Sequence, residues 1–187
     1  MEESAILVFS FVFLALATII AMPGVDACTN IPSMDIISAC HQASTSPRMY
    51  DLCTRTLSGV ARDNGEVLTY ALAAATAAAR SFESTAAAVA DNVSGEMKAA
   101  CEECESRYGA ARKLVGRVVG SLEGCFFDDV EAECVDAVAA VDDCATAVML
   151  VNPGVATPLH GMVLDDRDRT VLVLRLISLF VRKNSTI

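Results

Sequence analysis

The chain has 187 residues, of which 24 are acidic and 14 are Lys or Arg, so its formal net charge at pH 7 is −10. A surface of that charge repels nucleic acid and anionic membranes, and we therefore expect neither as a partner. A basic protein partner would suit it better. No segment shows strand alternation, which predicts an all-α fold.

The first 27 residues have the layout of a secretory signal peptide. An apolar run over residues 5–22 is followed by Pro23 and Gly24, and then by small residues at the cleavage positions, ending in Ala27. The run is also long enough for an uncleaved anchor, but the Pro-Gly break and the cleavage site favour removal. We predict a secreted single domain of residues 28–187 with net charge −7, which has no membrane contact after cleavage.

The next segments predict a short lead-in followed by helices. Residues 28–47 contain Pro and Ser breaks and predict an irregular or short-helix lead-in, and helical patterning starts at Met49. Residues 66–91 are rich in Ala, which favours a helix that packs closely against its neighbours.

Two further helices show an apolar seam at alternating spacings of four and three, which is typical of helices packed antiparallel in a left-handed bundle. The final helix, residues 166–182, is apolar except for a narrow polar stripe, and we expect it to be buried in the bundle. The seam residues are Met97, Cys101, Cys104, Tyr108, Ala111, Val115, Val118 and Leu122 in one helix, and Val130, Cys134, Ala137, Val141, Cys144 and Val148 in the next.

All eight cysteines follow the signal peptide, and their even number predicts a disulfide framework without a free thiol. Antiparallel helices joined near residue 125 bring Cys104 within one turn of Cys144. Cys40 and Cys53 flank a Ser/Thr/Pro turn and would close a hairpin. Cys125 and Cys134 lie close in sequence, and elimination then pairs Cys28 with Cys101. Asn92 and Asn184 begin glycosylation sequons.

No arrangement of residues predicts catalysis, a metal or a cofactor. Cys101 and Cys104 have CxxC spacing, but a zinc site needs about four ligands, and the two histidines, His41 and His160, are not suitably spaced. A structural disulfide is the better interpretation of this motif. The acidic pairs at residues 128–129, 142–143 and 165–166 are typical of helix starts and solvated faces rather than of a glycosidase dyad.

Together these blocks resemble the plant invertase and pectin methylesterase inhibitors. The resemblance rests on the hairpin block from Cys40 to Leu57, on the Cys104, Tyr108 and Ala111 spacing, and on Cys144 about 40 residues later. It implies an antiparallel four-helix bundle with an N-terminal, disulfide-stapled helical hairpin, located in the apoplast or plant cell wall. It also implies an inhibitor rather than an enzyme.

The resemblance leaves three functions open. Invertase inhibitors carry a Pro-Lys-Phe element, and no proline here is followed by Lys-Phe. This favours a reversible inhibitor of pectin methylesterase that covers the active-site cleft through the polar faces of helices 66–91, 97–122 and 130–148. An inhibitor of cell-wall or vacuolar invertase (beta-fructofuranosidase) is the alternative. A non-inhibitory secreted helical protein, such as a lipid-transfer-like module, is the third, although the adjacent Cys-Cys of lipid-transfer proteins is missing.

Overall fold

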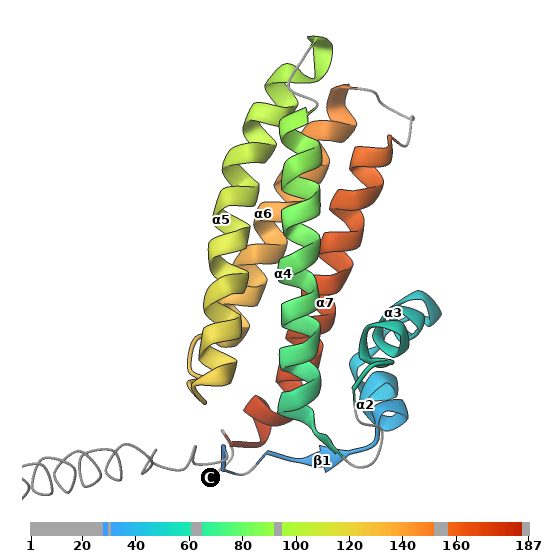
Figure 1. Cartoon of the computed structure of the whole chain (residues 1–187), viewed down its shortest axis with the longest axis vertical. Helices are drawn as coiled ribbons and strands as arrows, with labels where there is room; N and C mark the ends of the chain where they lie inside the picture. Colours follow the sequence, from blue (N-terminus) through green and yellow to red (C-terminus); the bar gives the residue numbers. More distant parts are fainter. Residues whose placement is uncertain (1–27, 30, 61–64, 92–94, 152–156, 185–187) are drawn as a thin grey trace, which may run out of the picture.

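The computed structural model describes residues 28–29, 31–60, 65–91, 95–151 and 157–184. Four long helices lie side by side as an antiparallel bundle, and a pair of short helices packs beside its lower half (Figure 1). The predicted all-α bundle with a helical hairpin is confirmed. The bundle helices are α4 (Val67–Asp91), α5 (Lys98–Glu123), α6 (Val130–Val151) and α7 (Pro158–Asn184), with a 3-10 turn η1 (Gly95–Met97) before α5.

The two predicted seams form the contact between α5 and α6. Every predicted seam residue of α6 is buried, and so is every one of α5 except Met97, which is half-buried and lies in η1. The alternation of three and four places one side chain per turn toward the neighbouring helix, so burial follows directly from the pattern. The core continues into α4, where Ala74, Ala75 and Ala78 are buried and allow close approach.

Helix α7 begins at Pro158, eight residues before the predicted start at Asp166. Pro is favoured at the first position of a helix because its missing N–H group would have no helical partner there. The Thr157 hydroxyl accepts a hydrogen bond from the His160 N–H group at 3.1 Å. The acidic pair at 165–166 therefore lies within the helix and not at its start.

The lead-in forms two capped helices, α2 (Ile36–Ala43) and α3 (Pro47–Leu57). The Asp35 carboxylate caps α2 by accepting a hydrogen bond from the Ser38 N–H group at 2.9 Å. The hydrogen bond from the Ser38 hydroxyl, and then that from the N–H group, lower the pKa of Asp35. The Ser46 hydroxyl caps α3 by accepting from the Met49 N–H group. The segment is thus a regular helical hairpin closed by Cys40–Cys53.

A two-residue ladder was not predicted, because two residues cannot show alternation. Strand β1 (Ser33–Met34) pairs antiparallel with β2 (Gly65–Glu66), just before α4. The Tyr70 hydroxyl donates to the Met34 carbonyl at 2.9 Å and accepts from the Gly65 N–H group at 3.1 Å. A Cβ atom at Gly65 would lie 2.8 Å from the Tyr70 hydroxyl, so this close approach requires glycine.

Two disulfides are as predicted and the other pairings were wrong. Cys40–Cys53 and Cys104–Cys144 are formed, whereas Cys28 pairs with Cys125 and neither Cys101 nor Cys134 forms a disulfide. The Cys104–Cys144 bridge fixes the helix register, so that Cys134 faces position 114 while Cys101 faces position 147. Cys101 and Cys134 thus lie about 20 Å apart along the bundle at 1.5 Å per residue. Cys125 lies in the α5–α6 turn, outside the seam that buries Cys134, and the segment at Cys28 reaches it.

Other sequence predictions concern residues outside the described ranges. The predicted signal peptide, residues 1–27, and the sequon residue Asn92 are not among the described residues. Asn184 is the last residue of α7, and its side chain is not described. Within the described ranges, no helix combines the length and the apolar character needed to cross a membrane.

Candidate functional site: the polar faces of the bundle

The candidate catalytic and metal-binding residues from the sequence lie apart. His41 is in the last turn of α2 and His160 in the first turn of α7. Asp142 and Asp143 each pair with an arginine, and Asp128 is exposed before α6. Among the residues that the structure describes, no cluster of three or more His, Cys, Asp or Glu side chains is placed to hold a metal ion.

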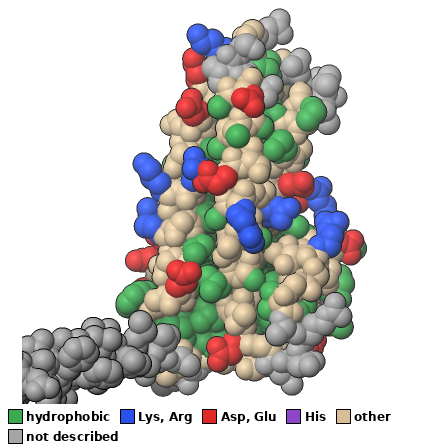
Figure 2. All heavy atoms as spheres, viewed as in Figure 1, with side chains coloured by type: hydrophobic (Ala, Val, Ile, Leu, Met, Phe, Trp, Pro, Cys, Tyr) green, Lys and Arg blue, Asp and Glu red, His purple; other side chains and the backbone are tan. Residues whose placement is uncertain are grey.

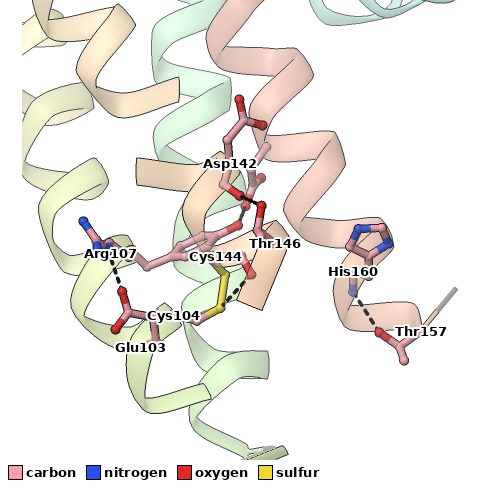
Figure 3. The surroundings of a disulfide bond; sticks show 10 residues. Glu103, Cys104, Arg107, Asp142, Cys144, Thr146, Thr157 and His160 are labelled. Atoms are coloured by element: carbon pink, nitrogen blue, oxygen red, sulfur yellow. Dashed lines mark hydrogen bonds and ion pairs between the residues drawn. A yellow bond between two sulfur atoms is a disulfide. The ribbon is translucent and has the colours of Figure 1, made fainter. Parts of the chain in front are cut away.

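The CxxC motif contributes one half of a helix–helix disulfide. Cys104 bridges α5 to α6 at Cys144 with a Cα–Cα distance of 4.6 Å, as predicted (Figure 3). Cys101 is buried, and burial raises the pKa of its thiol. Burial, together with Glu133 and Glu131, raises the pKa of the Cys134 thiol to about 12. Both thiols are therefore protonated and weakly reactive, as expected of core residues.

The disulfide lies beneath a charged surface shared by α5 and α6. The Arg107 guanidinium donates to Glu103 at 2.8 Å along α5 and lies 3.2 Å from Asp143 on α6. Figure 3 shows the Glu103–Arg107 pair beside the disulfide. Helix α6 has five acidic residues and no Lys or Arg, whereas α5 carries both signs. The outer surface of this helix pair is thus rigidly held and unevenly charged.

A groove of about 430 Å³ runs between α4 and α5. Ala86, Ala90 and Gly109 leave it hollow, and a Cβ atom at Gly109 would meet nothing within 4 Å. At its edge the Arg112 side chain contacts Glu83 at 2.6 Å across the two helices. This groove belongs to the face that the sequence predicted for enzyme contact.

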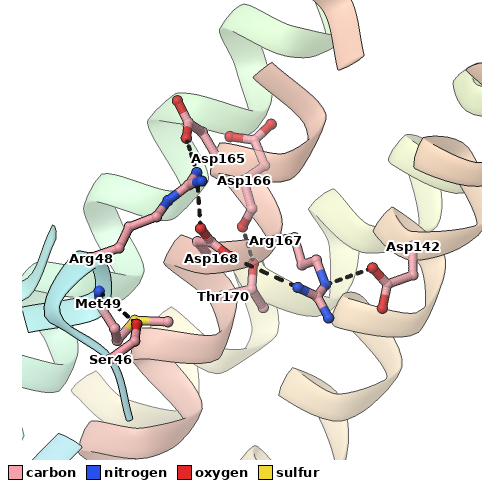
Figure 4. A network of polar contacts seen from close by, with 9 residues as sticks. All are labelled: Ser46, Arg48, Met49, Asp142, Asp165, Asp166, Arg167, Asp168 and Thr170. Carbon is pink, nitrogen blue, oxygen red and sulfur yellow. Dashed lines mark hydrogen bonds and ion pairs between the residues drawn. The ribbon is translucent and has the colours of Figure 1, made fainter. Parts of the chain in front are cut away.

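One turn of α7 holds the hairpin and α6 in place. The Arg48 side chain of α3 lies 3.0 Å from Asp165 and 3.1 Å from Asp168, while Arg167 contacts Asp142 of α6 at 2.6 Å (Figure 4). The sequence did not predict this network, because it depends on where the hairpin packs. It joins the hairpin to the bundle at α7.

Sequence reasoning also missed a polar layer inside the bundle. Asp166 and Thr170 of α7 are fully buried, and Asp166 accepts a hydrogen bond from Tyr108 of α5. The spacing in α7 could have revealed this layer, because α7 has its own seam with the same alternation of four and three. Asp166 and Thr170 occupy two core positions of that seam. The seam is Leu159, Val163, Asp166, Thr170, Val173, Ile177 and Phe180, all of which are buried.

The bundle, the stapled hairpin and the Cys104–Cys144 bridge agree with one family model, that of the plant invertase/pectin methylesterase inhibitors, which matches residues 35–179. The chain belongs to this inhibitor family. The matched region begins at the α2 cap and ends within α7, so it contains the hairpin and all of the bundle except the last residues of α7. A comparison with curated proteins found no match.

Membership of the inhibitor family gives a general role and leaves the target open. The family comprises inhibitors of pectin methylesterase or invertase, and not catalysts. An inhibitor acts by occupying a surface of its target, so the relevant site is an exposed face and not an internal cavity. The polar faces of α4, α5 and α6 are the candidate face.

Proposed function

We propose that this protein is a secreted inhibitor of a pectin methylesterase, which it binds reversibly over the active-site cleft in the apoplast. The observation that carries this proposal is the family match over residues 35–179. The absence of a Pro-Lys-Phe element from the sequence favours the esterase over invertase. The signal-peptide layout of residues 1–27 supports secretion.

The physical basis is a face that is ordered before binding. Disulfides fasten α5 to α6 and α2 to α3, and the Arg112–Glu83 contact links α4 to α5. A surface fixed in advance loses little conformational entropy on association, so more of its contact energy appears as affinity. An acidic inhibitor also has a favourable long-range attraction to a basic enzyme.

Two alternatives remain as outcomes of the test. Invertase is the second target class within the family. A bundle of this fold that inhibits neither enzyme is the third outcome, and the family match argues against a lipid-transfer module.

The deciding experiment titrates oxidised protein of residues 28–187 into a pectin methylesterase acting on methylated pectin, and into an invertase acting on sucrose. We expect stoichiometric, reversible loss of esterase activity and no effect on invertase. The reduced and alkylated protein is the control, because it has the same composition without the disulfide frame. Inhibition of invertase alone would overturn the target, and inhibition of neither would overturn the inhibitor role.

A further inference from the structure

The interior of the bundle contains a buried carboxyl group, that of Asp166. Asp166 of α7 is 0% exposed, and Tyr108 of α5, itself 1% exposed, donates to its Oδ2 atom at 3.0 Å. A buried carboxylate needs several donors or a close cation to compensate for lost hydration. Tyr108 and the nearby Ser81 and Thr85 hydroxyls are all neutral, and they give only part of that compensation.

The surroundings of the second carboxyl oxygen, Oδ1, favour the protonated form of Asp166. Within the described part of the chain, the buried Oδ1 atom has no hydrogen-bond partner in the geometry shown, although the Ser81 and Thr85 hydroxyls of α4 lie near the carboxyl group. The Thr85 hydroxyl donates to the Ser81 carbonyl at 3.3 Å, which leaves its oxygen lone pairs as acceptors. A protonated Asp166 can donate to the Thr85 oxygen, whereas an ionised one needs these hydroxyls to turn and donate to it.

The surrounding charges only partly oppose protonation. Burial is the largest influence on the pKa of Asp166 and raises it, while the hydroxyl groups and Arg169 of α7 act to lower it. Arg169 is the only charged side chain that acts on this pKa among the described residues. Other charged side chains of the packed helices form ion pairs, namely Asp142 with Arg167, Glu83 with Arg112, and Asp165 with Arg48.

We propose that Asp166 is a proton-dependent lock, whose neutral side chain fastens α7 to α4 and α5 and whose ionisation loosens the bundle. The carboxyl group binds its proton more tightly in the folded chain than in the unfolded one. Its contribution to stability is therefore complete below the unfolded pKa and is lost as the pH rises through the folded pKa. The lock depends on the fold alone and holds whichever enzyme is the target.

The test compares melting temperatures of the natural protein and Asp166→Asn over a pH series. The amide is neutral at every pH and can donate a hydrogen bond, so it imitates the protonated acid. We expect the natural protein to lose stability relative to Asp166→Asn as the pH rises, by about 3–5 °C for each tenfold difference in proton affinity between folded and unfolded states. Asp136→Asn, at an exposed position of α6, is the matched control and should track the natural protein at every pH.

If the melting temperatures of the natural protein and Asp166→Asn changed with pH in parallel, the proposed lock would be overturned. A direct measurement covers the case in which that variant does not fold. NMR titration of the Asp166 carboxyl carbon in the natural protein should give a midpoint above the ordinary value of 3.8. Tyr108→Phe removes the donor that favours the ionised form, so it should move this midpoint upward. A natural midpoint at or below the ordinary value would overturn the proposal.

Discussion

Three aspartates in one turn of α7 have three different surroundings. Asp165 is exposed and holds Arg48, Asp168 is largely covered and holds the same arginine, and Asp166 is buried against Tyr108. The sequence predicted a solvated pair at 165–166, because adjacent acidic residues commonly mark helix ends. Neighbours in a helix point about 100° apart, so one member of such a pair can face solvent while the other faces the core.

At the same scale, the structure predicts two protected thiols per chain. Native protein treated with iodoacetamide should remain unlabelled, because Cys101 and Cys134 are buried and their thiol pKa values are raised. After denaturation without a reductant, both should be labelled, and peptide mass spectrometry would locate the label. Labelling of any of the six remaining cysteines would contradict the disulfide pairs in which they lie. The absence of label after denaturation would instead show the fully paired framework predicted from the sequence.

At the scale of elements, the spacing of apolar residues predicted the features that depend on local sequence. These are the helices and the α5–α6 seam, and the seam in turn predicted that Cys104 lies near Cys144. Apolar spacing could not predict the Cys28–Cys125 disulfide, because the path of the lead-in to the α5–α6 turn depends on long-range packing. The position of the hairpin was missed for the same reason, since its link to α7 joins residues 117 positions apart.

The link between hairpin and bundle gives a prediction for Arg48→Ala. Removing the guanidinium should increase amide hydrogen exchange in α3 while leaving α5 and α6 unchanged, since the ion pairs of this arginine are with Asp165 and Asp168 of α7. The loss of global stability should be below about 1 kcal/mol, because the arginine is exposed. Arg55→Ala removes another exposed arginine of the same helix and is the matched control. Equal exchange in the two variants would contradict a role for Arg48 in seating the hairpin.

The bridge between α5 and α6 should contribute more stability than the hairpin bridge. Cys104–Cys144 closes a loop of 40 residues and Cys40–Cys53 one of 13, which correspond to about 4 and 3 kcal/mol in the loop-entropy model. The double variant Cys104→Ala, Cys144→Ala should therefore melt about 10 °C lower than the natural protein. The double variant Cys40→Ala, Cys53→Ala should melt at an intermediate temperature. The reverse order in calorimetry would show that the hairpin contributes more than its loop length implies.

At the scale of the whole molecule, charge acts through its distribution as well as through its sum. On the face seen in Figure 2, acidic and basic side chains are interspersed over the bundle. Helix α6 differs, since its 22 residues include five acidic ones and no basic one. With a net charge of −10 over the full chain, the long-range field is negative, and α6 adds a local concentration of that charge.

If charge steers this protein toward its enzyme, the complex should form more slowly as the salt concentration rises. The effect of a charge substitution on the association rate should also depend on its position. We expect the association rate with a basic pectin methylesterase to fall between low and moderate ionic strength, as measured by stopped-flow or surface plasmon resonance. Asp136→Lys on α6 and Asp51→Lys on α3 change the net charge equally, and both aspartates are exposed. If the polar faces of α4, α5 and α6 contact the enzyme, Asp136→Lys should slow association and weaken inhibition more than Asp51→Lys does. Equal effects would show that only net charge matters, and a larger effect of Asp51→Lys would place the contact on the hairpin instead.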